Sequence, residues 1–92
     1  MNARRTRTQI FIDILRSIQN SNGRMRKTHI VYKANLTNSR VESYLDFLLS
    51  KEMLSEESVN NQKFYTITER GLQFLSEVHK LREISDAFGI SF

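Results

Sequence analysis

The central part of the chain reads KTHIVYKANLTNSRVESYLDFLLSK over residues 27–51. Apolar residues recur at helical spacing on both sides of Asn35-Leu36-Thr37, which predicts helices over residues 28–34 and 37–51. The asparagine ends the first helix, the leucine is expected to be a buried turn residue, and the threonine caps the second helix. Two helices joined by a three-residue turn form a helix-turn-helix.

The segments on either side of this pair are also periodic. Upstream, an apolar stripe that follows a Thr8 cap predicts a helix that ends at the turn-forming residues 20–23. The β-branched residues inside this stripe leave a strand as the alternative. Downstream, alternation with period two predicts strands over residues 54–59 and 63–67, joined by a hairpin loop at residues 60–62. This hairpin is the predicted wing.

The last predicted helix begins after a Thr68 cap, with Glu69 in its first turn, and ends at Gly89. Leu72 and Leu75 are expected to close the core. A second apolar stripe has the alternating spacing of a coiled coil. Its members are Phe74, Val78, Leu81, Ser85 and Phe88. Because one small domain cannot cover both stripes, we predict a homodimer seam here. The alternative is that the end of the helix folds back on its own domain.

The length of 92 residues allows one domain with one core. The predicted fold is α+β and mostly α, a winged helix-turn-helix with three helices, a β-hairpin wing and a long C-terminal dimerisation helix. We expect three parts: a flexible basic arm over residues 1–7, the winged helix-turn-helix domain over residues 8–68, and the dimerisation helix over residues 69–92.

The composition excludes several classes of protein. Without cysteine the chain has no disulfide, no thiolate metal site and no cysteine nucleophile. No apolar run approaches the roughly 20 residues of a membrane span, and the start lacks the apolar region of a signal peptide. His29 and His79 lie far apart, and no catalytic carboxylate pair, Ser-His-Asp order or phosphate-binding glycine loop is present. We therefore predict a cytoplasmic, nucleoid-associated protein that is not an enzyme and has no metal, cofactor, membrane or small-molecule partner.

Charge is distributed unevenly along the chain. Residues 1–40 carry nine basic residues and one acidic residue, a net charge of +8. Residues 41–92 carry five basic and nine acidic residues, a net charge of −4. Such a polarised protein offers a polyanion one attractive face. A solvated basic surface without a partner is the alternative.

The start of the helix over residues 37–51 carries the groups expected to read DNA. Asn38, Ser39 and Arg40 form its first turn, and Ser43 follows one turn later. The N-terminal end of a recognition helix enters the major groove, where amide, hydroxyl and guanidinium groups meet base edges.

A second set of residues suits the phosphates of DNA, which position a protein without specifying sequence. The set comprises Arg4, Arg5, Arg7, Arg26, Lys27, Thr28, Lys33 and Lys63. The three arginines of the arm are predicted to follow the backbone or enter a minor groove, with an ordinary flexible terminus as the alternative. Glu56 and Glu57 adjoin the lysine of the wing, so we expect at most one contact at the wing tip.

A family resemblance rests on three stretches, KTHIVYKANLT (27–37), YLDFLL (44–49) and YTITERGLQFL (65–75). Over residues 8–85 the chain resembles the archaeal winged-helix family typified by a ten-kilodalton chromatin protein. The resemblance implies binding to double-stranded DNA and dimerisation through an antiparallel coiled coil of the last helix.

The chain departs from the family pattern in three ways. Glu52 stands where the family usually has glycine, so the turn into the wing is expected to differ or to be strained. Phe47 lies where a polar residue is usual, either as a loosely exposed aromatic or as part of an interface. The last helix is shorter than the long helix of the family.

These observations predict a sequence-preferring double-stranded DNA-binding protein, a transcriptional regulator that acts as a homodimer with helix 37–51 in the major groove. One alternative is an architectural chromatin protein that binds many duplexes. A second is a protein-interaction winged helix that docks a partner through Phe47 and the last helix and ignores DNA.

Overall fold

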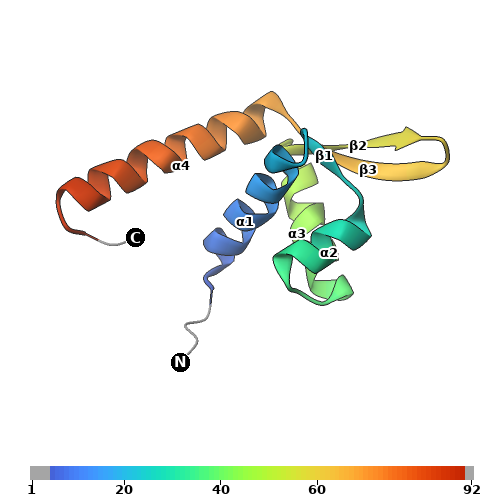
Figure 1. Ribbon diagram of the computed structural model, residues 1–92, viewed down its shortest axis with the longest axis horizontal. Coiled ribbons are helices and arrows are strands. Elements are labelled where there is room, and N and C mark those ends of the chain that lie inside the picture. The colour runs from blue at the N-terminus through green and yellow to red at the C-terminus, as the bar shows by residue number, and fades with distance from the viewer. Residues whose placement is uncertain (1–4, 91–92) are drawn as a thin grey trace.

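The computed structural model describes residues 5–90 (Figure 1). Its elements, in chain order, are α1 (Arg7–Asn20), β1 (Arg24–Met25), α2 (Lys27–Ala34), α3 (Asn38–Ser50), β2 (Leu54–Val59), β3 (Gln62–Ile67) and α4 (Glu69–Ala87). Helices α1, α2 and α3 gather in one group, from which the β2–β3 hairpin extends to one side and α4 to the other (Figure 1). This arrangement confirms the predicted winged helix-turn-helix. No helix in residues 5–90 is long and apolar enough to cross a membrane.

Helix α1 lies in the middle of the core, where it contacts α2, α4, β1 and β3. Its buried residues are Ile10, Ile12, Ile14, Leu15 and Ile18. These residues lie on more than one side of α1 because neighbouring elements cover more than one side of it. The β-branched run at residues 10–12 lies inside this helix, so the alternative of a strand is wrong.

The cap of α1 lies two residues before the predicted one. Thr6 accepts a hydrogen bond from the backbone N–H of Gln9 at 3.1 Å, and the Gln9 side chain accepts one from the Thr6 N–H at 3.0 Å. This reciprocal capping box needs Gln or Glu three residues after the cap. Thr8 has Phe11 at that position and lies inside the first turn instead. The other two threonine caps, Thr37 and Thr68, are confirmed.

The sheet has three antiparallel strands in the order β1-β3-β2. In the wing, Leu54 pairs with Ile67 and Val59 pairs with Gln62, so the loop is one residue shorter than predicted. Asn60 and Asn61 both have positive φ, 51° and 65°, the conformation of a type I′ hairpin turn. The two-residue strand β1 was not predicted.

The turn from α3 into the wing ends the helix with a left-handed residue. Glu52 has φ 60° and its N–H donates to the Leu49 carbonyl at 3.0 Å, while the Met53 N–H donates to the Leu48 carbonyl at 3.0 Å. This is a Schellman motif, in which glycine is usual. The Thr68 hydroxyl donates to the Glu52 carbonyl at 2.6 Å, which ties the turn to the cap of α4. The turn therefore has the usual geometry, and the strain lies at Glu52, a residue with a side chain in the left-handed conformation.

Helix α4 packs against the core only along its first half. A Cβ on Gly71 would lie 2.5 Å from the Met53 carbonyl oxygen, so a larger residue cannot approach as closely. Leu75 and Val78 are buried in the core. The prediction that Leu72 closes the core is wrong, because its side chain is 41% exposed.

The second half of α4 projects away from the other elements (Figure 1). Leu81, Ile84 and Phe88 are exposed there, by 47%, 56% and 76%. Val78 was predicted to lie on the outer seam, but it belongs to the core of its own chain. Ile84, which the prediction left out, lies on the exposed side. The outer stripe is therefore rotated slightly around the helix from its predicted position.

Candidate nucleic-acid interface

The outer face of α3 carries small polar side chains. Val41, Leu45 and Leu48 face the core. Ser39 and Ser43, two of the predicted DNA readers, are exposed, as is Asn38 in the first turn. The residues between the apolar ones therefore present hydroxyl and amide groups to solvent, as predicted.

Asp46 is also exposed and follows Ser43 by three residues on α3. The sequence prediction contained only basic and uncharged side chains and omitted it. Its helical spacing from Ser39 and Ser43 was the available signal. A carboxylate on a recognition helix accepts a hydrogen bond from the amino group of cytosine.

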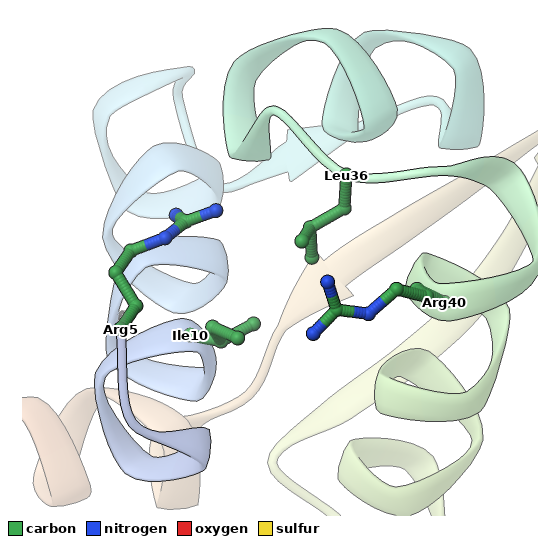
Figure 2. A pocket seen from close by; sticks show the side chains of 4 residues that line it. All are labelled: Arg5, Ile10, Leu36 and Arg40. Carbon is green, nitrogen blue, oxygen red and sulfur yellow. The ribbon is translucent and has the colours of Figure 1, made fainter. Parts of the chain in front are cut away.

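Arg40 leaves α3 on another side, toward α1. Arg5 and Arg40 point toward one another across a pocket of about 410 Å³ that is also lined by Ile10 and Leu36 (Figure 2). Sequence reasoning grouped Arg40 with the readers of bases, whereas its guanidinium lies at this pocket, on the side opposite Arg5. A guanidinium in this position suits a phosphate, which accepts several hydrogen bonds from arginine.

Arg5 is held in place by two other elements. Its Nη1 donates to the Asp13 carboxylate at 3.0 Å and its Nη2 donates to the Ala34 carbonyl at 2.6 Å. Arg5 therefore joins α1 to the end of α2. The prediction of a flexible arm is wrong at this residue and at Arg7, which is the first residue of α1. Arg4 lies outside the described residues.

Arg7 lies against aromatic rings instead of facing the outer side of α3. Its guanidinium carbon is 5.1 Å from the centroid of the Phe11 ring and 4.8 Å from that of Phe47. The two rings stack, with centroids 4.8 Å apart, and Tyr44 meets Phe11 edge-on at 5.1 Å. Phe47 is therefore half-buried in an aromatic cluster formed by Phe11, Tyr44 and Phe47.

The beginning of α2 brings together further predicted phosphate contacts. Lys27 Nζ donates a hydrogen bond to the Glu42 carboxylate on α3. This hydrogen bond, with the attraction of the two charges, lowers the pKa of the Glu42 carboxyl. Arg26 and Thr28 are exposed on either side of Lys27.

Lys33 is exposed near the end of α2. Within residues 5–90, neither Lys33 nor Arg26 nor Arg40 has an acidic side chain within ion-pair distance. These three cations keep their charge available to a ligand. Lys27 and Arg5 share theirs with a carboxylate.

The wing pairs its acidic residues with basic ones. Lys63 Nζ donates to the Glu56 carboxylate at 3.1 Å, and this hydrogen bond raises the pKa of Lys63. Arg24 Nη1 donates to Glu57 at 3.3 Å, and its guanidinium carbon lies 4.7 Å from the centroid of the Phe64 ring. These acids neutralise nearby cations, so the strands of the wing add little net positive charge.

Comparison with known proteins places the chain in a family. The sequence profile of the winged helix-turn-helix family matches residues 4–86. An uncharacterized protein of Methanocaldococcus jannaschii is 32% identical over 84 residues, which cover 91% of this chain and 80% of that protein.

Solved structures share the fold over most of the chain. The DNA-binding protein Sso10a-2 of Sulfolobus solfataricus matches with a TM-score of 0.74 and 27% identity, over 91% of this chain and 85% of that one. F93 from STIV, a winged-helix DNA-binding protein, matches with a TM-score of 0.72 and 20% identity, over 87% and 92%. YusO of Bacillus subtilis has a TM-score of 0.80 and 19% identity, and the match covers 90% of this chain and 60% of YusO.

Proposed function

The chain belongs to the winged helix-turn-helix family, and we propose that it binds double-stranded DNA with α3 in the major groove, as a sequence-preferring transcriptional regulator. The observation that carries this proposal is the exposed polar face of α3, flanked by the cations Arg26, Lys33 and Arg40 that have no acidic partner in residues 5–90. Sso10a-2 and F93 are described as DNA-binding proteins, which supports the same function here.

Sequence preference is favoured over architectural binding by the kind of residue on α3. Ser39, Ser43 and Asp46 offer hydroxyl and carboxylate groups. The phosphates of every duplex repel a carboxylate in the groove. This repulsion is offset only where the carboxylate accepts a hydrogen bond from a donor on a base. A protein that binds all duplexes alike gains nothing from Asp46.

Phosphates on either side of the groove meet the basic residues around α2 and the pocket. Arg26 and Thr28 lie at the beginning of α2, where the backbone N–H groups also attract an anion. Arg40, which has no acidic partner in residues 5–90, receives another phosphate at the pocket between α1 and α3 (Figure 2). The wing contributes at most one contact, from Lys63 or the asparagines at its tip. The site of action is the nucleoid, in the cytoplasm.

The protein acts as a homodimer in this proposal. The exposed stripe of Leu81, Ile84 and Phe88 on α4 supports it, because an apolar stripe on a projecting helix is stabilised when another apolar surface covers it. A second α4 has the matching stripe, and two-fold pairing of identical surfaces is the commonest way in which chains associate.

Selection of bound sequences from a random duplex pool tests the function. We expect one enriched motif, with two half-sites separated by a fixed spacing. The double variant Ser43→Ala and Asp46→Ala is expected to change that motif, whereas Ser76→Ala on exposed α4 leaves it unchanged. Even recovery of all sequences, with a steep dependence on salt, would instead identify an architectural protein. No binding to any duplex at low salt would overturn the DNA proposal and favour a protein partner.

A further inference from the structure

An apolar pocket of about 320 Å³ lies among α1, the end of α3 and the first half of α4. Phe11, Phe47 and Phe74 line it together with Met53, and Arg7 stands at its edge. Phe74 and Met53 also line a smaller hollow of about 210 Å³ beside Arg70 on α4. We call the apolar pocket lined by the three phenylalanines the aromatic groove.

The aromatic groove is not part of the proposed DNA contact surface. Phe47 leaves α3 on the side facing α1, where it stacks on Phe11, whereas Ser39 and Ser43 face solvent. Arg7 and Lys51 lie 4.8 Å and 5.7 Å from the centroid of the Phe47 ring. The groove thus has an aromatic floor with cations at its edge. Such a surface suits another aromatic side chain.

The end of α4 presents an aromatic side chain in a defined position. Phe88 is 76% exposed. The next two residues close a Schellman motif, in which the Gly89 N–H donates to the Asp86 carbonyl at 3.1 Å and the Ile90 N–H to the Ser85 carbonyl at 2.8 Å. Gly89 has φ 69°, the left-handed conformation that this motif requires. The backbone of Phe88 is therefore fixed at the end of a capped helix, so burial of this residue costs conformational entropy of the side chain but little of the backbone.

The spacing along α4 relates Phe88 to the aromatic groove of a second copy. Leu81 lies seven residues after Phe74 and seven residues before Phe88, about 10 Å along the helix in each direction. When two α4 helices pair antiparallel about an axis at Leu81, Phe88 of one copy lies beside Phe74 of the other. Parallel pairing places the two Phe88 side chains together and leaves both grooves open. Antiparallel pairing covers the stripe and the grooves, so it buries more apolar surface.

We propose that Phe88 of a second copy fills the aromatic groove, against Phe47 and Phe74. The inference rests on the proposed homodimer. It adds how the two α4 helices are aligned along one another and which side chain fastens them together. Because Phe47 belongs to α3, this contact joins the end of each recognition helix to the partner chain. The occupied groove therefore sets how the two recognition helices lie relative to one another, and with it the spacing of the DNA half-sites.

Photo-cross-linking tests the location of Phe88. The photoreactive residue p-benzoylphenylalanine replaces Phe88, and irradiation is expected to give a product of dimer mass whose cross-linked peptide contains Phe11, Phe47 or Phe74. The same residue in place of Phe64 on β3 is the control and is expected to give no dimer product. The molecular mass of the unmodified protein is measured separately by sedimentation. A dimer whose cross-links lie outside the aromatic groove would overturn this inference and leave the homodimer standing, whereas a monomer would overturn both.

The variant Phe88→Ala provides a second test. Because Phe88 is exposed in the single chain, its loss does not weaken folding, and any effect appears in association. Two phenylalanine side chains lose burial per dimer, so we expect the dissociation constant of the dimer to rise about 100-fold or more. Phe88→Leu is expected to restore most of the association. An unchanged dissociation constant for Phe88→Ala would overturn the proposal.

Discussion

Lys27, the first residue of α2, forms an ion pair with Glu42 in α3. The pair joins the two helices of the helix-turn-helix and uses a cation that sequence reasoning assigned to DNA phosphate. Since the pKa of Glu42 is lowered in the folded state, the pair stabilises the fold above the ordinary pKa of the carboxyl. This contribution is lost as the pH falls through the lowered pKa.

The variant Glu42→Gln is therefore expected to bind DNA more tightly, because Lys27 becomes available to a phosphate. The slope of log affinity against log salt concentration should steepen by about one unit. Fluorescence anisotropy at several salt concentrations measures both quantities. Glu83→Gln, on the projecting part of α4, changes the net charge equally and is expected to have a smaller effect. Equal effects of the two variants would show that only net charge matters.

Arg40→Ala is expected to weaken binding to all duplexes alike, because its guanidinium faces the pocket shared with Arg5. The slope of the salt dependence should fall by about one unit. Asp46→Ala on the outer face of α3 should instead change the relative affinities of different duplexes. Anisotropy titrations with the selected site and a scrambled site separate the two effects. A loss for Arg40→Ala confined to the selected site would mean that Arg40 reads a base.

Glu52→Gly is expected to stabilise the protein by about 0.5–1 kcal/mol, because glycine adopts the left-handed conformation without the steric cost that glutamate bears. Urea denaturation measures the free energy of unfolding. Asn35→Gly is the matched control, since Asn35 has φ 55° and asparagine tolerates this conformation better. The prediction fails if Glu52→Gly gains no more than the control does.

Gly71→Ala is expected to destabilise the protein by about 1–3 kcal/mol, although alanine favours helices. The added Cβ would lie 2.5 Å from the Met53 carbonyl oxygen and 2.8 Å from Ile67 Cγ1, so α4 has to move away from the wing. Ser76→Ala, at an exposed position of the same helix, should change stability by less than about 0.5 kcal/mol. Thermal and urea unfolding of the two variants provide the comparison. Equal stability of Gly71→Ala and the parent would contradict the close approach.

Local patterns were enough to predict most of the fold. The apolar spacing on both sides of Asn35-Leu36-Thr37 predicts α2 and α3 because each helix has to bury one side, and this signal lies within a few residues. The caps at Thr37 and Thr68 are equally local, since a threonine side chain bonds to a backbone N–H three residues later. At Thr6 the partner Gln9 gives the same signal, which the prediction overlooked in favour of Thr8.

For the candidate site, the sequence indicated which residues were polar and exposed on α3, but the directions of its long side chains depend on distant neighbours. Arg40 turns toward Arg5, and Lys27 pairs with a residue fifteen positions away. Helical periodicity predicts on which side of a helix a side chain lies. It does not predict which charged residue of another element that side chain will meet.

The sequence by itself therefore determined the order and type of the main elements of this protein, because helices, hairpins and caps arise from neighbouring residues. Only the tertiary structure decided which residues of α4 face outward. Gly71 lets this helix approach the Met53 carbonyl, and the contact sets its rotation so that Val78 is buried and Ile84 is exposed. The two-residue strand β1 likewise exists only through its pairing with β3, since two residues have no periodicity of their own.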